Sequence, residues 1–145
     1  MNRIKISLPD SFQFSTILTI RVSDLNYGGH VGNDSFLVLI QEARQQFLLS
    51  HGYEELSIEG VGLIMTDVAI EFKKELNYGD RVTIWVAADG FDKLGFDLFY
   101  KLEVTNREET QIAGKAKTGM LCYDYINKKK VAVPQEVLKK LLGQK

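Results

Sequence analysis

The sequence has few of the side chains that form disulfides or metal sites. It contains one cysteine and two histidines in 145 residues. A single cysteine cannot form an internal disulfide, and one cysteine with two histidines is too small a set for a typical zinc cluster. We therefore expect no metal site, and a chain that stays in a reducing compartment of the cell.

The sequence also lacks a surplus of positive charge and any long apolar run. Lys and Arg number 18 and Asp and Glu 19, so the formal net charge is -1, and no basic surplus can neutralise the phosphates of nucleic acid or an anionic membrane. No stretch approaches the roughly twenty apolar residues of a membrane span, and residues 1–20 lack the apolar core of a signal peptide. We expect neither nucleic acid nor a membrane as a partner, and a cytoplasmic location.

What the sequence does contain is an ordinary globular composition. Hydrophobic residues make up 45% and charged residues 26% of the chain, which differs from the low apolar content and high net charge of disordered proteins. A chain of 145 residues is also long enough to bury one hydrophobic core. We therefore predict a single domain that covers residues 1–145.

The hydrophobic pattern predicts a mixed α+β domain. Residues 14–22 are rich in β-branched side chains that alternate imperfectly, which favours a strand. Residues 34–52 place apolar side chains at helical spacing, with Asn33 or Asp34 as the cap and Gly52 as the stop. In the second half of the chain the period changes to two, which predicts four more strands before a short C-terminal helix. These strands are expected at residues 62–76, 81–89, 95–105 and 110–126, and the short helix at residues 134–145.

Short turns separate the four later strands, so we expect an antiparallel meander packed on the long helix. Gly114, Ala116 and Thr118 share one strand face, and such small side chains let a helix approach the sheet closely. Trp85 and Phe99 lie on the opposite face of their strands. They form either an aromatic patch that contacts another subunit or two partly exposed side chains shielded by loops.

One stretch carries a resemblance to a known family. From Arg21 to Arg44 the sequence reads RVSDLNYGGHVGNDSFLVLIQEAR. It resembles the hotdog-fold acyl-CoA thioesterases of the 4-hydroxybenzoyl-CoA thioesterase type, whose signature is approximately DxDxxGHVxNxxYLxxxExAR. The similarity continues more weakly to Pro134 and so covers nearly the whole chain. The positions in register are Asp24, Gly29, His30, Val31, Asn33, Leu37, Glu42, Ala43 and Arg44.

The resemblance implies a hotdog fold, in which a five-stranded antiparallel sheet wraps around one long central helix. It also implies a homodimer with a continuous sheet, assembly of such dimers into a homotetramer, and an active site at the dimer interface. The implied reaction is hydrolysis of an acyl-CoA thioester to the free acid and CoA. The CoA thioester is then the substrate, and no cofactor is expected.

Thioester hydrolysis needs donors for the carbonyl oxygen, which becomes negative in the transition state. The first amides of a helix have no internal partners and carry the positive end of the helix dipole. In related thioesterases the amide at the position of Asn33 binds this oxygen, so we expect the same here. The alternative is a glycine loop that only turns and caps the helix. The loop residues expected to contact the substrate are Tyr27, Gly28, Gly29, Val31 and Gly32.

Several residues are candidates for taking the proton of the attacking water. In the family the second aspartate of DxD is the usual base or nucleophile. Here this position is Asn26, whose amide can orient water but cannot accept its proton. His30 is a candidate because a neutral imidazole accepts a proton near pH 7, and the carboxylates of Asp24, Glu42 and Asp67 are the others. Each also has a structural alternative, and acyl-CoA binding without turnover is a second interpretation of the whole site.

Coenzyme A also needs positive charge near the entrance of its site, because its phosphates are anionic. We expect Lys93, Lys115 and Lys117 to supply it. Lys73 and Lys74, which precede a turn, are further candidates. Each of these lysines could instead be an ordinary solvated side chain.

Overall fold

The computed structural model describes residues 1–143, which form two α helices, a short 3₁₀ helix and a six-stranded sheet. The helices are α1 (Asn33–Ser50), α2 (Gln135–Leu141) and the 3₁₀ helix η1 (Val22–Asp24). The strands are β1 (Phe14–Thr19), β2 (Gly62–Phe72), β3 (Arg81–Asp89), β4 (Gly95–Asn106), β5 (Glu109–Asp124) and β6 (Lys129–Lys130). Of the predicted C-terminal helix, residues 144–145 lie outside the described part. No helix in residues 1–143 is long and apolar enough to cross a membrane.

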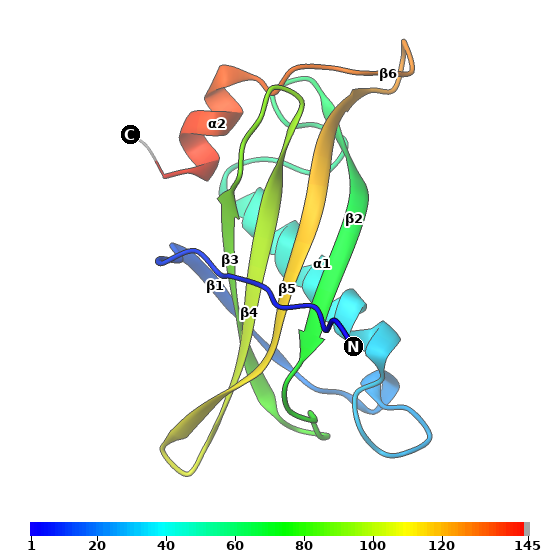
Figure 1. Cartoon of the computed structure of the whole chain (residues 1–145), viewed down its shortest axis with the longest axis vertical. Coiled ribbons are helices and arrows are strands. Elements are labelled where there is room, and N and C mark those ends of the chain that lie inside the picture. The colour runs from blue at the N-terminus through cyan, green and yellow to red at the C-terminus, as the bar shows by residue number, and fades with distance from the viewer. Residues whose placement is uncertain (144–145) are drawn as a thin grey trace.

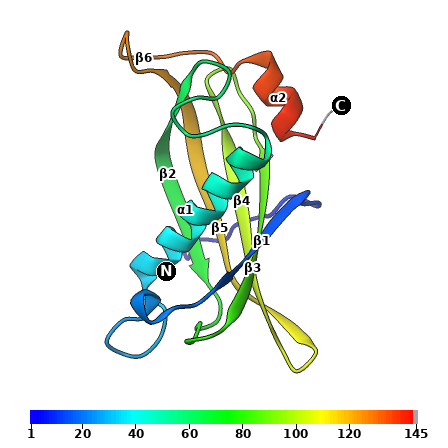
Figure 2. The same cartoon turned by 180° about the vertical axis from the view of Figure 1, so that it is seen from behind.

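The sheet is antiparallel and curves around α1. Figure 1 shows its outer face, and Figure 2 shows α1 lying across the opposite face. The strand order is β1-β3-β4-β5-β2, and β6 pairs with the end of β5. The predicted α+β hotdog fold, with a five-stranded antiparallel sheet around one long helix and a short C-terminal helix, is therefore confirmed.

The predicted meander is right for β3, β4 and β5 and wrong for β2. β2 pairs with β5 at the far edge of the sheet and not with β3, which follows it in the sequence. The reason lies in the crossing segment, residues 73–80, which connects these two strands. The amide of Ile20 donates to the carbonyl of Asp80 at 2.8 Å, and the amide of Gly79 donates to the carbonyl of Ile20 at 3.0 Å. These bonds draw the crossing segment towards β1, so β3 pairs with β1.

The inner face of α1 packs on the sheet as its apolar spacing predicts. At Gly114 an added Cβ would lie 2.9 Å from Cε1 of Phe36, so the predicted close approach of helix and sheet is confirmed. α1 ends at Ser50, and Gly52 has a φ of +79°, which glycine adopts without steric cost. The buried residues of the stripe are Phe36, Leu39, Ile40, Ala43 and Phe47.

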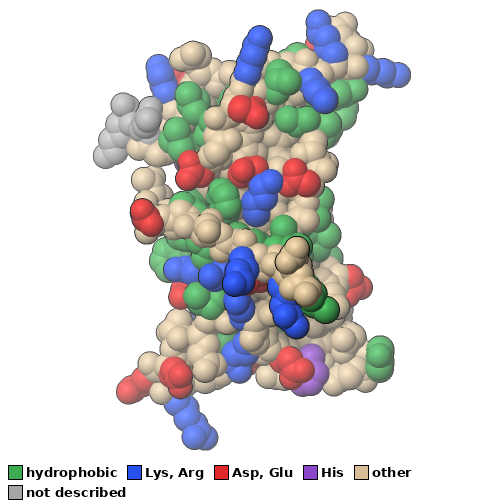
Figure 3. Space-filling model, viewed as in Figure 1, with side chains coloured by type: hydrophobic (Ala, Val, Ile, Leu, Met, Phe, Trp, Pro, Cys, Tyr) green, Lys and Arg blue, Asp and Glu red, His purple; other side chains and the backbone are tan. Residues whose placement is uncertain are grey.

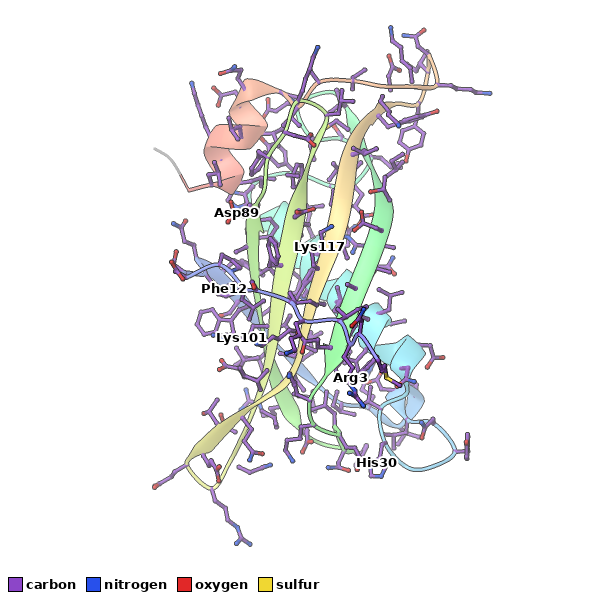
Figure 4. The ribbon with its side chains drawn as sticks, viewed as in Figure 1. Arg3, Phe12, His30, Asp89, Lys101 and Lys117 are labelled. Carbon is purple, nitrogen blue, oxygen red and sulfur yellow. The ribbon has the colours of Figure 1, made fainter. Side chains whose placement is uncertain are left out.

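Residues 1–13 form a strap across the outer face of the sheet, the face away from α1 (Figure 1). Ile6 on this N-terminal strap is only 9% exposed. Nζ of Lys101 lies 5.3 Å from the ring centre of Phe12, on the strap, and 5.6 Å from that of Trp85 (Figure 4). A cation over an aromatic face is attracted by the ring quadrupole. Trp85 and Phe99 are both half-buried in the single chain, and contact of this outer face with another subunit stays a prediction.

A partly buried ion pair connects α1 to the rest of the domain. Arg44 is 5% exposed, and its Nε donates to Oε1 of Glu55 at 2.6 Å. Towards the sheet, Nη1 of Arg44 donates to the Tyr100 hydroxyl at 3.5 Å, which in turn is 2.7 Å from Oγ1 of Thr118. Burial raises the pKa of the Tyr100 hydroxyl, so it stays protonated. Polar contacts therefore fix the position of α1 together with its apolar packing.

Replacing Arg44 tests how much this ion pair contributes. Arg44→Ala leaves the Glu55 carboxylate without its ion-pair partner, whereas the Tyr100 hydroxyl keeps Thr118. Because Glu55 is 30% exposed, we expect the free energy of unfolding to fall by about 3 kcal/mol, the low end for a buried pair. Arg21→Ala is the control, because the Arg21 side chain is 71% exposed and a surface ion pair contributes less than about 1 kcal/mol. Chemical denaturation measures both losses. Equal losses would mean that the buried pair does not hold α1 in place.

Candidate active site

The buried carboxylate of Asp24 holds the start of the loop that precedes α1. Its Oδ2 accepts the amide hydrogen of Arg21 at 2.8 Å, and its Oδ1 lies 3.4 Å from Nη2 of the same residue. The Asp24 carbonyl accepts the amide of Gly32 at 3.3 Å. These bonds join the two ends of the loop, and they turn the Asp24 carboxylate towards Arg21.

Asn26 shapes the middle of the same loop. Its side-chain oxygen accepts the amide hydrogen of Gly28 at 2.9 Å, as in an Asx turn. Its backbone amide donates to the carbonyl of His30 at 2.8 Å, and its carbonyl accepts the amide of Gly29 at 3.1 Å. Gly29 has a φ of +81°, a region that favours glycine. Asn26 thus closes the turn that presents His30, with Tyr27 fully exposed at the tip.

α1 begins without a side-chain cap. The predicted caps, Asn33 or Asp34, are wrong, because the N-cap is Gly32 and Asp34 accepts the amide of Ser35 instead, at 3.0 Å. Within residues 1–143 the amides of Asn33 and Asp34 make no hydrogen bond. Two donors at the positive end of the helix dipole are therefore available to an external oxygen.

A cleft with a volume of about 240 Å³ opens beside the start of α1, where Figure 2 shows the helix next to the end of β2. The rings of Phe36 and Phe72 form its apolar wall, with centres 5.0 Å apart and planes at 78°. The other lining residues are Val31, Asn33, Lys73, Lys74 and Glu75. The cleft therefore combines an apolar wall, a residue with a free amide and charges of both signs.

His30 lies next to this cleft and is held by the crossing segment. Its backbone forms an antiparallel bridge with Asn77, and its Nδ1 lies 3.0 Å from Oδ1 of Asn77. On the other side of the ring, Nε2 lies 3.4 Å from Oε2 of Glu75. Figure 4 shows His30 at the end of the molecule where this loop lies. An amide oxygen can only accept, so this contact is a hydrogen bond when the ring hydrogen is on Nδ1, and Nε2 then carries the lone pair.

Two other carboxylates considered from the sequence lie away from the cleft. Glu42 is exposed on α1, where its Oε2 accepts a hydrogen bond from Gln46 at 2.9 Å, in a hollow shared with Leu18 of β1. Asp67 is exposed on β2 and lies 2.7 Å from Nζ of Lys117 on the outer face. The hydrogen bond from Lys117 lowers the pKa of Asp67. The structure therefore brings neither carboxylate to His30.

The lysines predicted to bind coenzyme A are also spread over the molecule. Lys117 is held between Asp67 and Asp97, at 2.7 and 3.2 Å, and the hydrogen bond with Asp67 raises its pKa. Lys115 is its neighbour on the outer face, where side chains of both charges gather (Figure 3). Lys93 lines a hollow beside α2. Of the five lysines considered, only Lys73 and Lys74 line the cleft.

Sequence reasoning did not select Glu75, Asn77 or Phe72. Glu75 fell within the strand predicted at residues 62–76 and Asn77 in the turn after it, and no local pattern indicates that the crossing segment passes the loop before α1. The one available signal was their position at the end of a predicted strand, because loops at strand ends carry functional side chains. Their contacts with His30 and α1 depend on which strands pair.

A larger hollow, of about 420 Å³, lies at the other end of α1 and includes Phe14, Phe47 and His51. Burial lowers the pKa of His51, so its imidazole is neutral at pH 7. Burial also raises the pKa of Cys122 to about 11, so this free cysteine stays a thiol. Among residues 1–143, no group of three His, Cys, Asp or Glu side chains could hold a metal ion. Neither the hollow with His51 nor the Cys122 thiol lies beside the loop before α1, the free helix amides or the His30 imidazole.

Comparisons with known proteins show the family of this chain and relate its fold to solved structures. One similar solved structure is a 1,4-dihydroxy-2-naphthoyl-CoA thioesterase from Synechocystis, with 21% identity over 88% of this chain and 94% of that chain and a TM-score of 0.74. A second is a 4-hydroxybenzoyl-CoA thioesterase variant with its 4-hydroxybenzoyl-CoA ligand, with 15% identity over 88% of this chain and 97% of that chain and a TM-score of 0.79. A third is a Staphylococcus aureus protein in complex with CoA, with 17% identity over 95% of this chain and 87% of that chain and a TM-score of 0.78. No curated protein matches the sequence. A family model described as the thioesterase-like superfamily matches residues 20–141, which include the loop, α1 and the crossing segment. The chain therefore belongs to the thioesterase-like superfamily of hotdog proteins.

Proposed function

We propose that the protein hydrolyses an acyl-CoA thioester to the free acid and CoA. The observation that carries this proposal is the pair of free amides of Asn33 and Asp34 at the start of α1, one of which belongs to a cleft-lining residue. A thioester carbonyl oxygen bound there accepts both hydrogen bonds more strongly as it becomes negative. The names of structurally similar proteins, two CoA thioesterases and one complex with CoA, support CoA thioesters as the substrate class.

The cleft offers separate places for the two ends of such a substrate. The rings of Phe36 and Phe72 provide an apolar surface for the acyl group. Lys73 and Lys74 line the same cleft and supply positive charge for the coenzyme phosphates. Contacts from Lys93, Lys115 and Lys117 stay predictions, as do substrate contacts from the loop residues.

His30 is the best-placed group to take the proton of the attacking water. With the ring hydrogen on Nδ1, facing Asn77, Nε2 carries the lone pair that accepts a proton, and the Glu75 carboxylate lies 3.4 Å from the same nitrogen. Asn26 contributes as the residue that holds the loop. Asp24 stays a prediction as a catalytic group, since its carboxylate is engaged by Arg21.

A homodimer would complete this site. β2 is the last strand of the sheet, and its outer edge is unpaired within residues 1–143. Three apolar side chains along it are exposed, Met65 at 42%, Val68 at 41% and Phe72 at 50%. An unpaired apolar edge favours pairing with the same strand of a second copy, and Phe72 belongs to both the edge and the cleft. The homotetramer and the cytoplasmic location stay predictions.

A spectrophotometric screen for free CoA tests the proposed reaction. Short, long and aromatic acyl-CoAs should each be offered, and we expect release of CoA above the buffer rate for at least one class. Calorimetry with a nonhydrolysable acyl-CoA analogue tests the alternative that the protein binds without turnover. Tight binding with no release at high protein concentration would favour that alternative, since Asn26 occupies the usual position of the family's carboxylate.

Asn33→Pro tests the role of the helix amide. Proline removes this one N–H, and the first position of a helix tolerates it; Gly32 already has a ψ of 158°, which suits a residue before proline. We expect kcat to fall by about 10² while the helix content measured by circular dichroism is kept. Asn33→Ala retains the amide, so its fall in kcat should be at least about tenfold smaller than that of Asn33→Pro. Equal losses would assign the effect to the side chain.

Val68→Lys tests the proposed dimer. A charged side chain on the apolar edge of β2 would be buried without a partner in the dimer, so we expect a monomer in sedimentation equilibrium. Ile17→Lys, on the opposite edge strand β1, is the matched control because Ile17 is also exposed, at 52%. A dimer that persists in Val68→Lys and dissociates in Ile17→Lys would place the interface on β1.

A further inference from the structure

We propose that Glu75 supplies the carboxylate of the active site and acts through His30. This inference rests on the proposed hydrolysis and adds to it a positioning residue from a different part of the chain. The family signature places its carboxylate in the loop, at the position of Asn26. Here the carboxylate comes from the crossing segment, which lies beside that loop.

The contacts that carry this inference lie on both sides of one imidazole ring. Oε2 of Glu75 is 3.4 Å from Nε2 of His30, and Oδ1 of Asn77 is 3.0 Å from Nδ1. Among residues 1–143, Glu75 is the one carboxylate in ion-pair contact with this ring. Glu75 also lines the cleft together with Asn33. The acid, the imidazole and the free helix amide thus belong to one region.

Backbone bonds hold these side chains in register. The carbonyl of His30 accepts the amide of Asn26 at 2.8 Å, and the amide of Val31 donates to the carbonyl of Leu76 at 3.0 Å. The loop and the crossing segment therefore run side by side as a short antiparallel pair. Positioned in this way, the ring requires little reorganisation before it reacts.

The arrangement gives each group one role in a balanced reaction. Water attacks the carbonyl carbon and forms the C–O bond while Nε2 of His30 takes one water proton. The oxyanion that forms accepts the amides of Asn33 and Asp34. The C–S bond then breaks, and the imidazolium returns its proton to the leaving sulfur, which gives the acid and the CoA thiol.

Glu75 contributes because the imidazole becomes positive in this reaction. A carboxylate 3.4 Å from Nε2 stabilises the imidazolium by opposite charge. In hydrolytic triads the aspartate instead contacts the other ring nitrogen, a place that Asn77 occupies here. Lys73 and Lys74 line the same cleft as Glu75, and Nζ of Lys73 lies 3.0 Å from Oε2 of Glu71.

A merely structural ion pair would behave differently. The His30 and Glu75 side chains are 41% and 73% exposed, and pairs this open to water contribute little to folding stability. Removing a surface contact of that kind leaves kcat unchanged. A role in the reaction instead lowers kcat, because the interaction strengthens in the transition state.

Glu75→Gln is the central test, on the full-length protein with the best acyl-CoA substrate. We expect kcat to fall by at least about tenfold, with KM within about twofold of the original, and Glu75→Asp to recover part of the loss. Glu136→Gln is the matched control, because Glu136 forms a similarly exposed pair with Lys139 on α2, at 3.7 Å. An unchanged kcat in Glu75→Gln, or an equal fall in Glu136→Gln, would overturn the inference.

A double-mutant cycle separates action through His30 from other effects. His30→Gln should lower kcat by on the order of 10² to 10⁴, and adding Glu75→Gln to it should cause no further loss, because both act through one ring. Losses that multiply would overturn the inference by showing that Glu75 acts independently.

One readout does not depend on turnover. Ring ¹⁵N resonances of His30 report which nitrogen carries the hydrogen, and both Glu75→Gln and Asn77→Ala should shift them. If no acyl-CoA is hydrolysed, the proposed function fails while this measurement still tests the contacts of the ring. Unshifted resonances in both variants would overturn the inference whether or not the protein is a hydrolase.

Discussion

The two hydrogen bonds between Ile20 and the end of the crossing segment determine much of what this domain can do. They bring β3 to β1 and leave β2 at the opposite edge, so residues 73–80 must pass the loop in front of α1. The same constraint creates the cleft, because the charged residues after β2 then lie beside the start of the helix. It also leaves the apolar edge of β2 available for another chain. One local pairing thus sets both the site and the proposed interface.

Most of the fold could be predicted from the sequence because its signals are local. The apolar stripe of α1, the small residues that face it on β5 and the alternation within β3 and β4 each lie within one element. The position of β2 could not be predicted, since short turns favour neighbouring pairs and the competing bonds to Ile20 join distant parts of the chain. The prediction of the helix cap was also wrong. Asn33 and Asp34 both have side chains suited to an N-cap, and the structure places Gly32 at that position.

The site also contains residues that the local sequence predicts and residues that only the strand order brings in. The loop, the helix amides and His30 could be recognised from one continuous stretch, since the signature residues are close in sequence. Glu75 and Asn77 could not, because their contacts with His30 require the strand order. The sequence alone does not distinguish the lysines that could bind the coenzyme. Only the sheet shows that Lys73 and Lys74 line the cleft, whereas Lys115 and Lys117 lie on the outer face.

The turn closed by Asn26 has a consequence for reading relatives of this chain. Its side-chain oxygen accepts one backbone hydrogen bond, a task that a short side chain such as Asp, Asn or Ser can perform. In this chain the residue at this position therefore shapes the loop without itself accepting the proton of the attacking water. A relative that lacks the signature aspartate should be judged by the side chain that its crossing segment presents to the imidazole.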